Sequence, residues 1–175
     1  HDALPIYLNN DKEIFLPSGV AISPSAAAHC LLELKRTAVF LRGIKKAIDT
    51  KIIGNSEPVR ILYAGSGPYA TLITPLLTMY KPENLKITIL DINQTSLYAA
   101  KKLIKALELH DFIDDFILED ATVFKLDKDY DIVISETMQS CLNNEPQVNI
   151  MQNLIPQMNK KAIFIPERIS VDANL

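Results

Sequence analysis

A chain of 175 residues is long enough for one well-buried domain and too short for two ordinary ones. The composition is 48% hydrophobic and 22% charged with a net charge of −3, which is typical of a soluble globular protein and gives no electrostatic footprint for nucleic acid. No apolar run approaches the roughly 20 residues that a membrane-spanning helix needs. The sequence shows no signal peptide, so we expect a cytoplasmic protein.

Residues 1–22 predict an N-terminal arm, either irregular or folded as a small hairpin. A helical segment is expected over 23–50, because Ser23 suits an N-cap and Pro24 suits the first helical position. Gly43 is the point where this helix would break or kink. The apolar positions that indicate the helix are Ala27, Leu31, Leu34, Ala38 and Leu41.

The main domain is expected over 58–167, where strand patterns alternate with helix patterns. The predicted strands are 59–64, 85–91, 116–118, 130–135 and 162–165, and the predicted helices are 71–80, 96–109 and 146–158. Most strands are continuous apolar runs, which indicates a parallel sheet covered on both faces. The expected fold is therefore α/β, with a Rossmann-like, doubly wound and mainly parallel sheet. Residues 168–175 would begin a further strand or a C-terminal domain, so the chain looks like part of something longer.

A glycine-punctuated turn follows the first of these strands. Gly65 and Gly67 lack side chains where a nucleoside-binding loop must turn sharply, and Ala70 is small enough for close packing of helix on strand. Asp91 ends the second strand roughly 20 residues after the loop, where an acid can accept hydrogen bonds from both ribose hydroxyls. This combination fits a nicotinamide dinucleotide as well as other nucleoside ligands.

Acidic residues also follow the third and fourth strands, at Asp120 and Glu136. Ligands of open parallel sheets bind beyond the carboxyl ends of the strands. We therefore expect the glycine loop, Asp91, Asp120 and Glu136 to meet in one crevice. The two cysteines, Cys30 and Cys141, have neither disulfide-framework nor zinc-site spacing; we expect buried free thiols and no metal site.

These residues resemble a known family. The turn at 64–67, the acid at 90–91 and the run 119–121 resemble the class I S-adenosylmethionine-dependent methyltransferases. Residues 135–145 are similar to the double-glutamate segment of the protein arginine methyltransferases, and 163–168 resembles the strand by which those enzymes leave the nucleotide fold for a β-barrel. The resemblance covers roughly residues 31–175.

The resemblance implies S-adenosyl-L-methionine as the cofactor. Arg36 would hold the carboxylate of its methionine part, and the acid at Asp120 would meet the adenine amino group. Glu136 and Glu145 are the expected catalytic residues, because two carboxylates can clamp a guanidinium and direct its nitrogen toward the methyl group. The implied cofactor contacts are Arg36, Gly65, Ser66, Gly67, Asp91, Ile92, Asp120, Ala121 and Glu136.

The chain departs from the family pattern at several positions. Tyr63 stands where the superfamily usually has an acid, and Tyr69 replaces the last glycine of the loop. Thr137 replaces a large aromatic residue, and Asn143 and Asn144 replace an aromatic pair that walls the substrate pocket. The resemblance therefore supports cofactor binding more strongly than it supports the identity of the acceptor. A guanidinium or an amine is the expected acceptor.

Other interpretations stay open. Glu136 is also explained as a strand-end carboxylate bonded to loop amides, Glu145 as a helix-opening acid, and Arg36 as a surface-paired residue. The alternative functions are a small-molecule methyltransferase, a nicotinamide-dependent oxidoreductase, and a non-catalytic nucleoside-binding or scaffold domain. The sequence does not define the oligomeric state.

Overall fold

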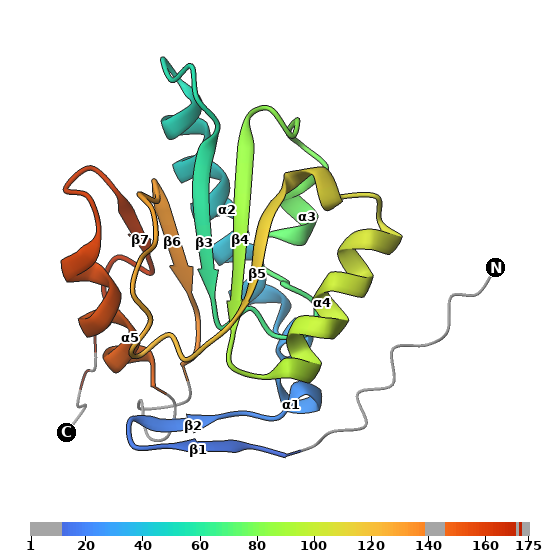
Figure 1. Cartoon of the computed structure of the whole chain (residues 1–175), viewed down its shortest axis with the longest axis vertical. Coiled ribbons are helices and arrows are strands. Elements are labelled where there is room, and N and C mark those ends of the chain that lie inside the picture. Colours follow the sequence, from blue (N-terminus) through green and yellow to red (C-terminus); the bar gives the residue numbers. More distant parts are fainter. Residues whose placement is uncertain (1–11, 139–145, 171, 173–175) are drawn as a thin grey trace.

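A five-stranded sheet forms the centre of the molecule. The computed structural model describes residues 12–138, 146–170 and 172. Within them the sheet order is β5-β4-β3-β6-β7, with each neighbouring pair parallel (Figure 1). The strands are β3 (Val59–Ala64), β4 (Leu85–Asp91), β5 (Ile113–Leu118), β6 (Ile132–Ser135) and β7 (Ile163–Ile165). The predicted Rossmann-like α/β fold is confirmed, and β3 and β4 have the predicted bounds.

Helices and a long loop cover the two faces of this sheet. Ile61 and Tyr63 of β3 pack into one core with α2 (Leu34–Ile52), α3 (Thr74–Leu77) and α4 (Gln94–Ala106). Leu62 and Ala64 of the same strand pack into a second core with α5 (Gln147–Leu154). Because successive side chains of a strand point to opposite faces, a strand buried on both sides is a continuous apolar run.

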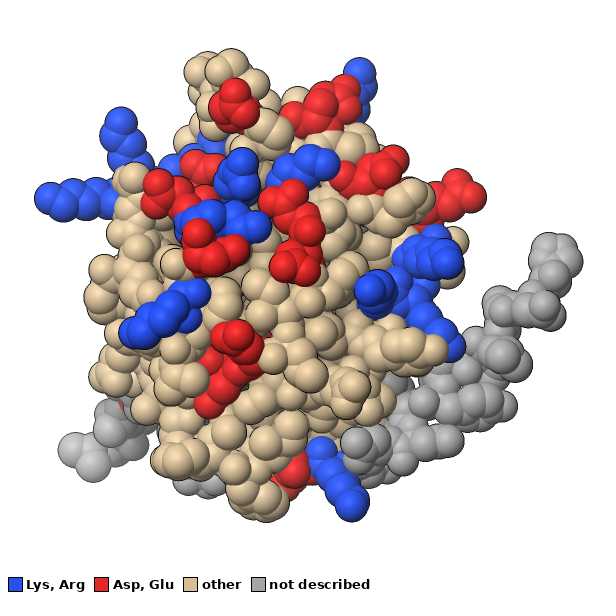
Figure 2. Space-filling view, in the orientation of Figure 1, with Lys and Arg blue, Asp and Glu red and all other residues tan. Residues whose placement is uncertain are grey.

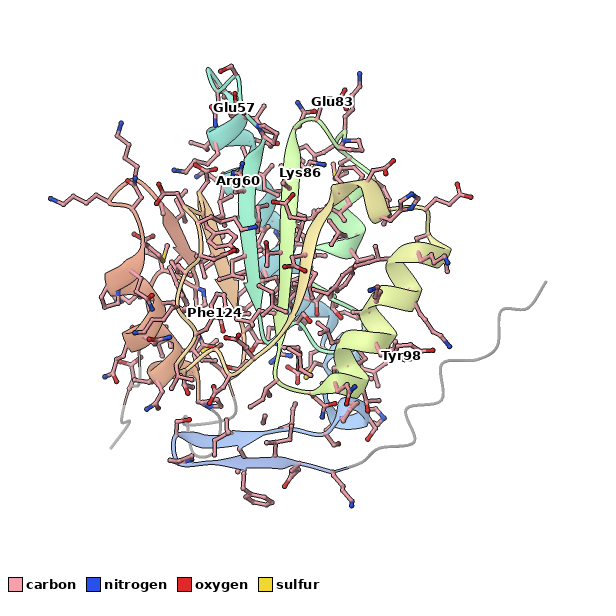
Figure 3. The ribbon with its side chains drawn as sticks, viewed as in Figure 1. Glu57, Arg60, Glu83, Lys86, Tyr98 and Phe124 are labelled. Atoms are coloured by element: carbon pink, nitrogen blue, oxygen red, sulfur yellow. The ribbon has the colours of Figure 1, made fainter. Side chains whose placement is uncertain are left out.

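The face covered by α5 includes a helix-free stretch, residues 119–131. Two side-chain amides hold this stretch in place. The amide nitrogen of Asn153 donates to the carbonyls of Ala121 (3.0 Å) and Phe124 (2.8 Å), and that of Gln157, in the short 3₁₀ turn η4 (Ile155–Gln157), donates to Phe124 (3.1 Å). Phe124 lies on this face of the sheet (Figure 3). Side-chain amides thus anchor the loop that follows β5.

The N-terminal described residues form a hairpin and a short helix beside the carboxyl ends of the central strands (Figure 1). Strands β1 (Ile14–Leu16) and β2 (Gly19–Ala21) pair antiparallel. Helix α1 (Pro24–His29) follows, and the hydroxyl of Ser23 accepts from the backbone N–H of Ala26 (3.3 Å), as the N-cap pattern predicts.

The break in the N-terminal helical segment lies earlier than expected. Gly43 does not interrupt α2, whereas a 3₁₀ turn, η1 (Cys30–Leu32), and the non-helical Glu33 separate α1 from α2. The predicted break at Gly43 was wrong, because Gly43 lies inside the continuous helix α2, whereas Leu34, whose spacing indicated an unbroken helix, is 72% exposed beside the actual break. The core-facing residues of α2 come later, at Ile44, Ala47 and Ile48.

The helix predicted over 71–80 is much shorter, covering only α3. Pro75 lies in its first turn, and its ring would clash with the carbonyl of residue 71 if the helix began earlier. Helices α4 and α5 lie close to their predicted positions, although α4 ends at Ala106. Residues 168–170 are in no strand, and the rest of 168–175 lies outside the described residues except for Asp172.

Charged side chains gather at the amino-terminal edge of the sheet. Figure 2 shows most of the charges of this face over its upper half, where Figure 3 places Arg60, Glu83 and Lys86. Arg60 and Lys128 both pair with Asp114, at 3.6 and 3.7 Å. The opposite charges at this edge thus interact with one another.

Candidate functional site

A pocket lies at the carboxyl ends of the central strands. Its walls come from the β1–β2 hairpin, α1, α2 and the segments that follow β3, β4, β5 and β6. Nine of the ten predicted site residues line it, and the tenth, Glu145, lies outside the described residues. The nine are Arg36, Gly65, Ser66, Gly67, Asp91, Ile92, Asp120, Ala121 and Glu136.

The glycine loop after β3 requires glycine for steric and conformational reasons. Gly65 and Gly67 have φ angles of +72° and +63°, in the left-handed region that side chains disfavour. A Cβ on Gly65 would also lie 2.5 Å from Cγ2 of Thr137. The end of β6 therefore packs directly on the backbone of the loop.

Asp91 fixes this loop from the tip of β4. Its Oδ2 accepts from the backbone N–H of Gly67 (2.8 Å) and from the hydroxyl of Ser66 (3.5 Å), and its Oδ1 accepts from the N–H of Asn93 (2.8 Å). The side chain is buried at 7% exposure. Burial raises the pKa of Asp91, although these three hydrogen bonds act to lower it. No ion pair involves Asp91 within the described part of the chain.

Asp120 has a structural role in addition to its place in the pocket. Its Oδ1 accepts from both the backbone N–H and the hydroxyl of Thr122, each at 2.8 Å. This pattern holds the turn after β5, next to Ala121. Asp120 thus presents a carboxylate to the pocket from a turn that the same carboxylate stabilises.

Arg36 and Glu136 form an ion pair across the pocket. Nη1 of Arg36, in the first turn of α2, donates to Oε1 of Glu136 at 3.0 Å, and its Nε lies 3.4 Å from Oε2 of Glu33. The side chains of Arg36 and Glu136 are 27% and 9% exposed. Burial by itself lowers the pKa of Arg36. The negative charge of Glu136, with smaller contributions from other contacts, outweighs this effect, so the pKa of Arg36 is raised. Burial also raises the pKa of Glu136, because the pairing with Arg36 offsets only part of its desolvation.

Sequence reasoning missed Gln147, which holds the strand end that carries Glu136. Gln147 is fully buried. Its amide oxygen accepts from the N–H (2.8 Å) and hydroxyl (2.9 Å) of Thr137, and its amide nitrogen donates to the carbonyl of Ser135 (3.1 Å). A glutamine at the start of a helix gives no sequence signal for this role. Asn93 also lines the pocket and was not named from the sequence. It is the N-cap of α4, and an asparagine between a strand and a helix is a sequence signal for that position.

The departures Tyr63 and Thr137 both line the pocket. Burial, together with the charges of Glu136 and Asp91, raises the pKa of Tyr63, so its phenol stays neutral. The hairpin contributes Leu16, Val20 and Ala21 to the same wall as α1. Cys30, also in the pocket, is a free thiol that is half-buried rather than fully buried, because it lies at the exposed junction of α1 and α2.

The described residues hold no group of three His, Cys, Asp or Glu side chains placed to bind a metal ion. Among the helices formed by residues 12–138 and 146–170, none has the length and apolarity to cross a bilayer.

The strand order, the glycine loop after β3 and the pocket beyond the strand ends are those of a Rossmann-like fold, which the chain shares with solved class I S-adenosylmethionine-dependent methyltransferases. The resemblance seen in the sequence is thus confirmed at the level of the fold. Neither the protein-family models nor the curated proteins compared with the chain give a match.

Among solved structures, the chain is similar to a protein of the Trypanosoma brucei PRMT1 enzyme–prozyme heterotetrameric complex with AdoHcy, with a TM-score of 0.60 and 19% identity over 78% of this chain. It also matches the glycopeptide N-methyltransferase MtfA complexed with S-adenosylmethionine (TM-score 0.49, 16% identity, 69% of this chain). A third match is a methyltransferase from Thiobacillus denitrificans with S-adenosyl-L-homocysteine (TM-score 0.48, 19% identity, 71% of this chain). The chain spans 40%, 47% and 46% of their respective lengths.

Proposed function

We propose that this chain is the S-adenosyl-L-methionine-binding part of a methyltransferase that methylates a nitrogen of a cationic acceptor, in the manner of the protein arginine methyltransferases. The observation that carries the proposal is a single pocket with Asp91 at one wall and the Arg36–Glu136 pair at another. This arrangement suits a ligand that has a ribose at one end and an amino acid at the other.

Asp91 suits the ribose. The carboxylate accepts three hydrogen bonds from the protein and, with about four acceptor positions, retains capacity for a ligand hydroxyl. A buried carboxylate without an ion-pair partner among the described residues gains most from further donors. The side-chain-free backbone of Gly65 and Gly67 lets the nucleoside approach closely, and Asp120 with Ala121 would border the adenine.

Arg36 suits the carboxylate of the methionine part, because a guanidinium forms charge-assisted hydrogen bonds with carboxylates in a fixed geometry. Ser66, which contacts Asp91, and Ile92, which follows it, also line the pocket and would contact the ligand near its ribose. The residues present therefore fit the cofactor.

Glu136 suits a cationic acceptor. Its pKa is raised by burial even beside Arg36, so its ionised form has unused capacity to pair with a second cation. When bound, S-adenosylmethionine supplies a methyl group activated by its sulfonium. Glu136 would orient the acceptor nitrogen so that its lone pair forms the new C–N bond as the C–S bond breaks, after which the nitrogen loses a proton. Glu145 would complete a carboxylate pair and is proposed on sequence grounds alone.

A small-molecule methyltransferase is the second candidate, favoured by Thr137. Thr137 is a small residue on the side of the pocket where the acceptor would bind, and its hydroxyl donates to the amide oxygen of Gln147 at 2.9 Å. Loss of a bulky aromatic at this position would leave room for an acceptor other than a peptide side chain.

Calorimetric titration tests the cofactor assignment. We expect the chain to bind S-adenosylhomocysteine in preference to NAD and NADP, and Asp91→Ala to weaken binding about 10- to 100-fold through loss of charge-assisted hydrogen bonds. Asp129→Ala, which removes an exposed acid, is the matched control and should bind like the parent. Preference for a nicotinamide cofactor would establish an oxidoreductase instead, and binding of no nucleoside would indicate a scaffold.

A transfer assay then tests the acceptor. With methyl-labelled S-adenosylmethionine, guanidinium and amine compounds are offered to the parent chain and to Glu136→Gln. We expect Glu136→Gln to lose transfer while it still binds S-adenosylhomocysteine. Equal transfer by both proteins would remove the proposed role of Glu136.

A further inference from the structure

Two glutamates contact the guanidinium of Arg36, and the thiol of Cys30 also interacts with it. Glu33 approaches its Nε (3.4 Å) and Glu136 accepts from its Nη1 (3.0 Å). A guanidinium offers a carboxylate two bidentate edges, Nε with Nη2 and Nη1 with Nη2. Each edge therefore contains one nitrogen that already contacts a glutamate. A third carboxylate that binds Arg36 bidentately therefore has to share a nitrogen with one of these glutamates or displace it.

The two glutamates differ in where they lie. Glu136 lines the pocket at the end of β6 and is 9% exposed, whereas Glu33 lies outside the pocket lining, before α2, and is 61% exposed. A ligand in the pocket therefore meets the edge of Arg36 that Glu136 occupies. Glu33 contacts Nε, which belongs to the other edge of the guanidinium.

We propose that the carboxylate of the cofactor displaces Glu136 from Arg36, and that this exchange frees Glu136 to bind the cationic acceptor. The inference rests on the proposed function and adds an order to it: the cofactor binds first and the acceptor second. In the unliganded protein, Arg36 donates to Glu136 at 3.0 Å, so a cationic acceptor has to compete with Arg36 for this carboxylate.

Three adenosine compounds separate the parts of this exchange. 5′-Methylthioadenosine has no amino-acid part, 5′-(3-carboxypropylthio)-5′-deoxyadenosine adds only the carboxylate, and S-adenosylhomocysteine adds both carboxylate and ammonium. The ratio of the dissociation constants of the first two compounds measures what the carboxylate contributes. Because the first compound lacks the carboxylate, its binding also verifies that each variant is folded.

Glu136→Gln is the decisive variant. Removing the competing charge should strengthen binding of the carboxypropyl compound about 1.5- to 5-fold, the range expected for a partly exposed ion pair, and leave 5′-methylthioadenosine unchanged. In an Arg36→Ala background the same substitution should have no effect on the ratio. Asp49→Asn is the matched control, because it removes the carboxylate of another α2 ion pair, with Lys45 at 2.6 Å, outside the pocket lining. An unchanged or smaller ratio in Glu136→Gln would overturn the exchange.

The order is tested with methylguanidinium as the probe. Saturation-transfer NMR should detect its binding to the parent chain when S-adenosylhomocysteine is bound, and not when the site is empty or holds 5′-methylthioadenosine. Equal binding in all three states, or binding in none, would overturn the release of Glu136. If none of the three adenosine compounds binds the parent chain, the proposed function itself fails. The two failures are therefore distinguishable.

Discussion

The buried amide of Gln147 should be one of the more important polar side chains for stability. Gln147→Ala would leave the N–H and hydroxyl of Thr137 and the carbonyl of Ser135 without the partners they now have at 2.8, 2.9 and 3.1 Å. A buried polar group left unsatisfied costs about 1–3 kcal/mol. Only the Ser135 carbonyl is fully buried, whereas Thr137 lines the pocket and is partly exposed, so the expected total is about 2–4 kcal/mol. That is a large part of the roughly 5–15 kcal/mol of a typical domain.

Urea unfolding followed by circular dichroism measures this loss. Gln147→Met separates the loss of hydrogen bonds from the loss of packing, because methionine nearly fills the volume of glutamine but makes none of its hydrogen bonds. We expect Gln147→Met to cost nearly as much as Gln147→Ala. Gln152→Ala, at an exposed amide of the same helix, should stay within about 0.5 kcal/mol of the parent. If both Gln147 variants also stay within that margin, the hydrogen bonds to the end of β6 contribute nothing and the reasoning is refuted.

Three further outcomes follow from the site. Gly65→Ala should destabilise the fold by about 1–3 kcal/mol through its φ of +72° and the contact with Thr137. Gly43→Ala, in open space on α2, should instead stabilise it by about 0.5–1 kcal/mol, and the urea midpoints of the two variants measure both effects. Binding of S-adenosylhomocysteine, titrated at several pH values, should weaken as the pH falls through the raised pKa of Asp91, because a protonated carboxyl loses acceptor capacity. The raised pKa of Glu136 predicts that its ionisation disfavours the folded state, so the unfolding free energy of Glu136→Gln relative to the parent should increase as the pH rises from about 4 toward 7. A difference that shrinks over that range would contradict the assigned direction.

The sheet could be predicted from sequence because its strands are buried on both faces. Such strands are unbroken apolar runs, and β3 and β4 show this most clearly, with charged residues confined to their ends or edges. The tips of these strands carried the prediction of the pocket, because the ends of parallel strands meet at one edge. Nine residues named from sequence line that pocket.

The helix ends were less predictable, because they depend on apolar side chains that are exposed and on the restricted backbone of proline. Leu31 and Leu34 have the spacing of a core stripe and yet are exposed, so periodicity predicted a continuous helix across residues 30–33, where the structure breaks it. Pro75 delayed the start of α3. Gln147 could not be identified from the sequence, because its hydrogen bonds from α5 to the end of β6 are formed between residues whose pairing no local sequence pattern indicates.

The two buried acids of the pocket share a physical property. Burial raises the pKa of both Asp91 and Glu136, so each carboxylate is less well compensated in the fold than in water. A chain under selection for stability alone has no reason to keep such groups, and strongly perturbed acids in a pocket are frequent at functional sites. A ligand that brings hydroxyl donors to Asp91 and a cation to Glu136 would relieve both. The acids that weaken the empty protein are thus the groups with most to gain from binding.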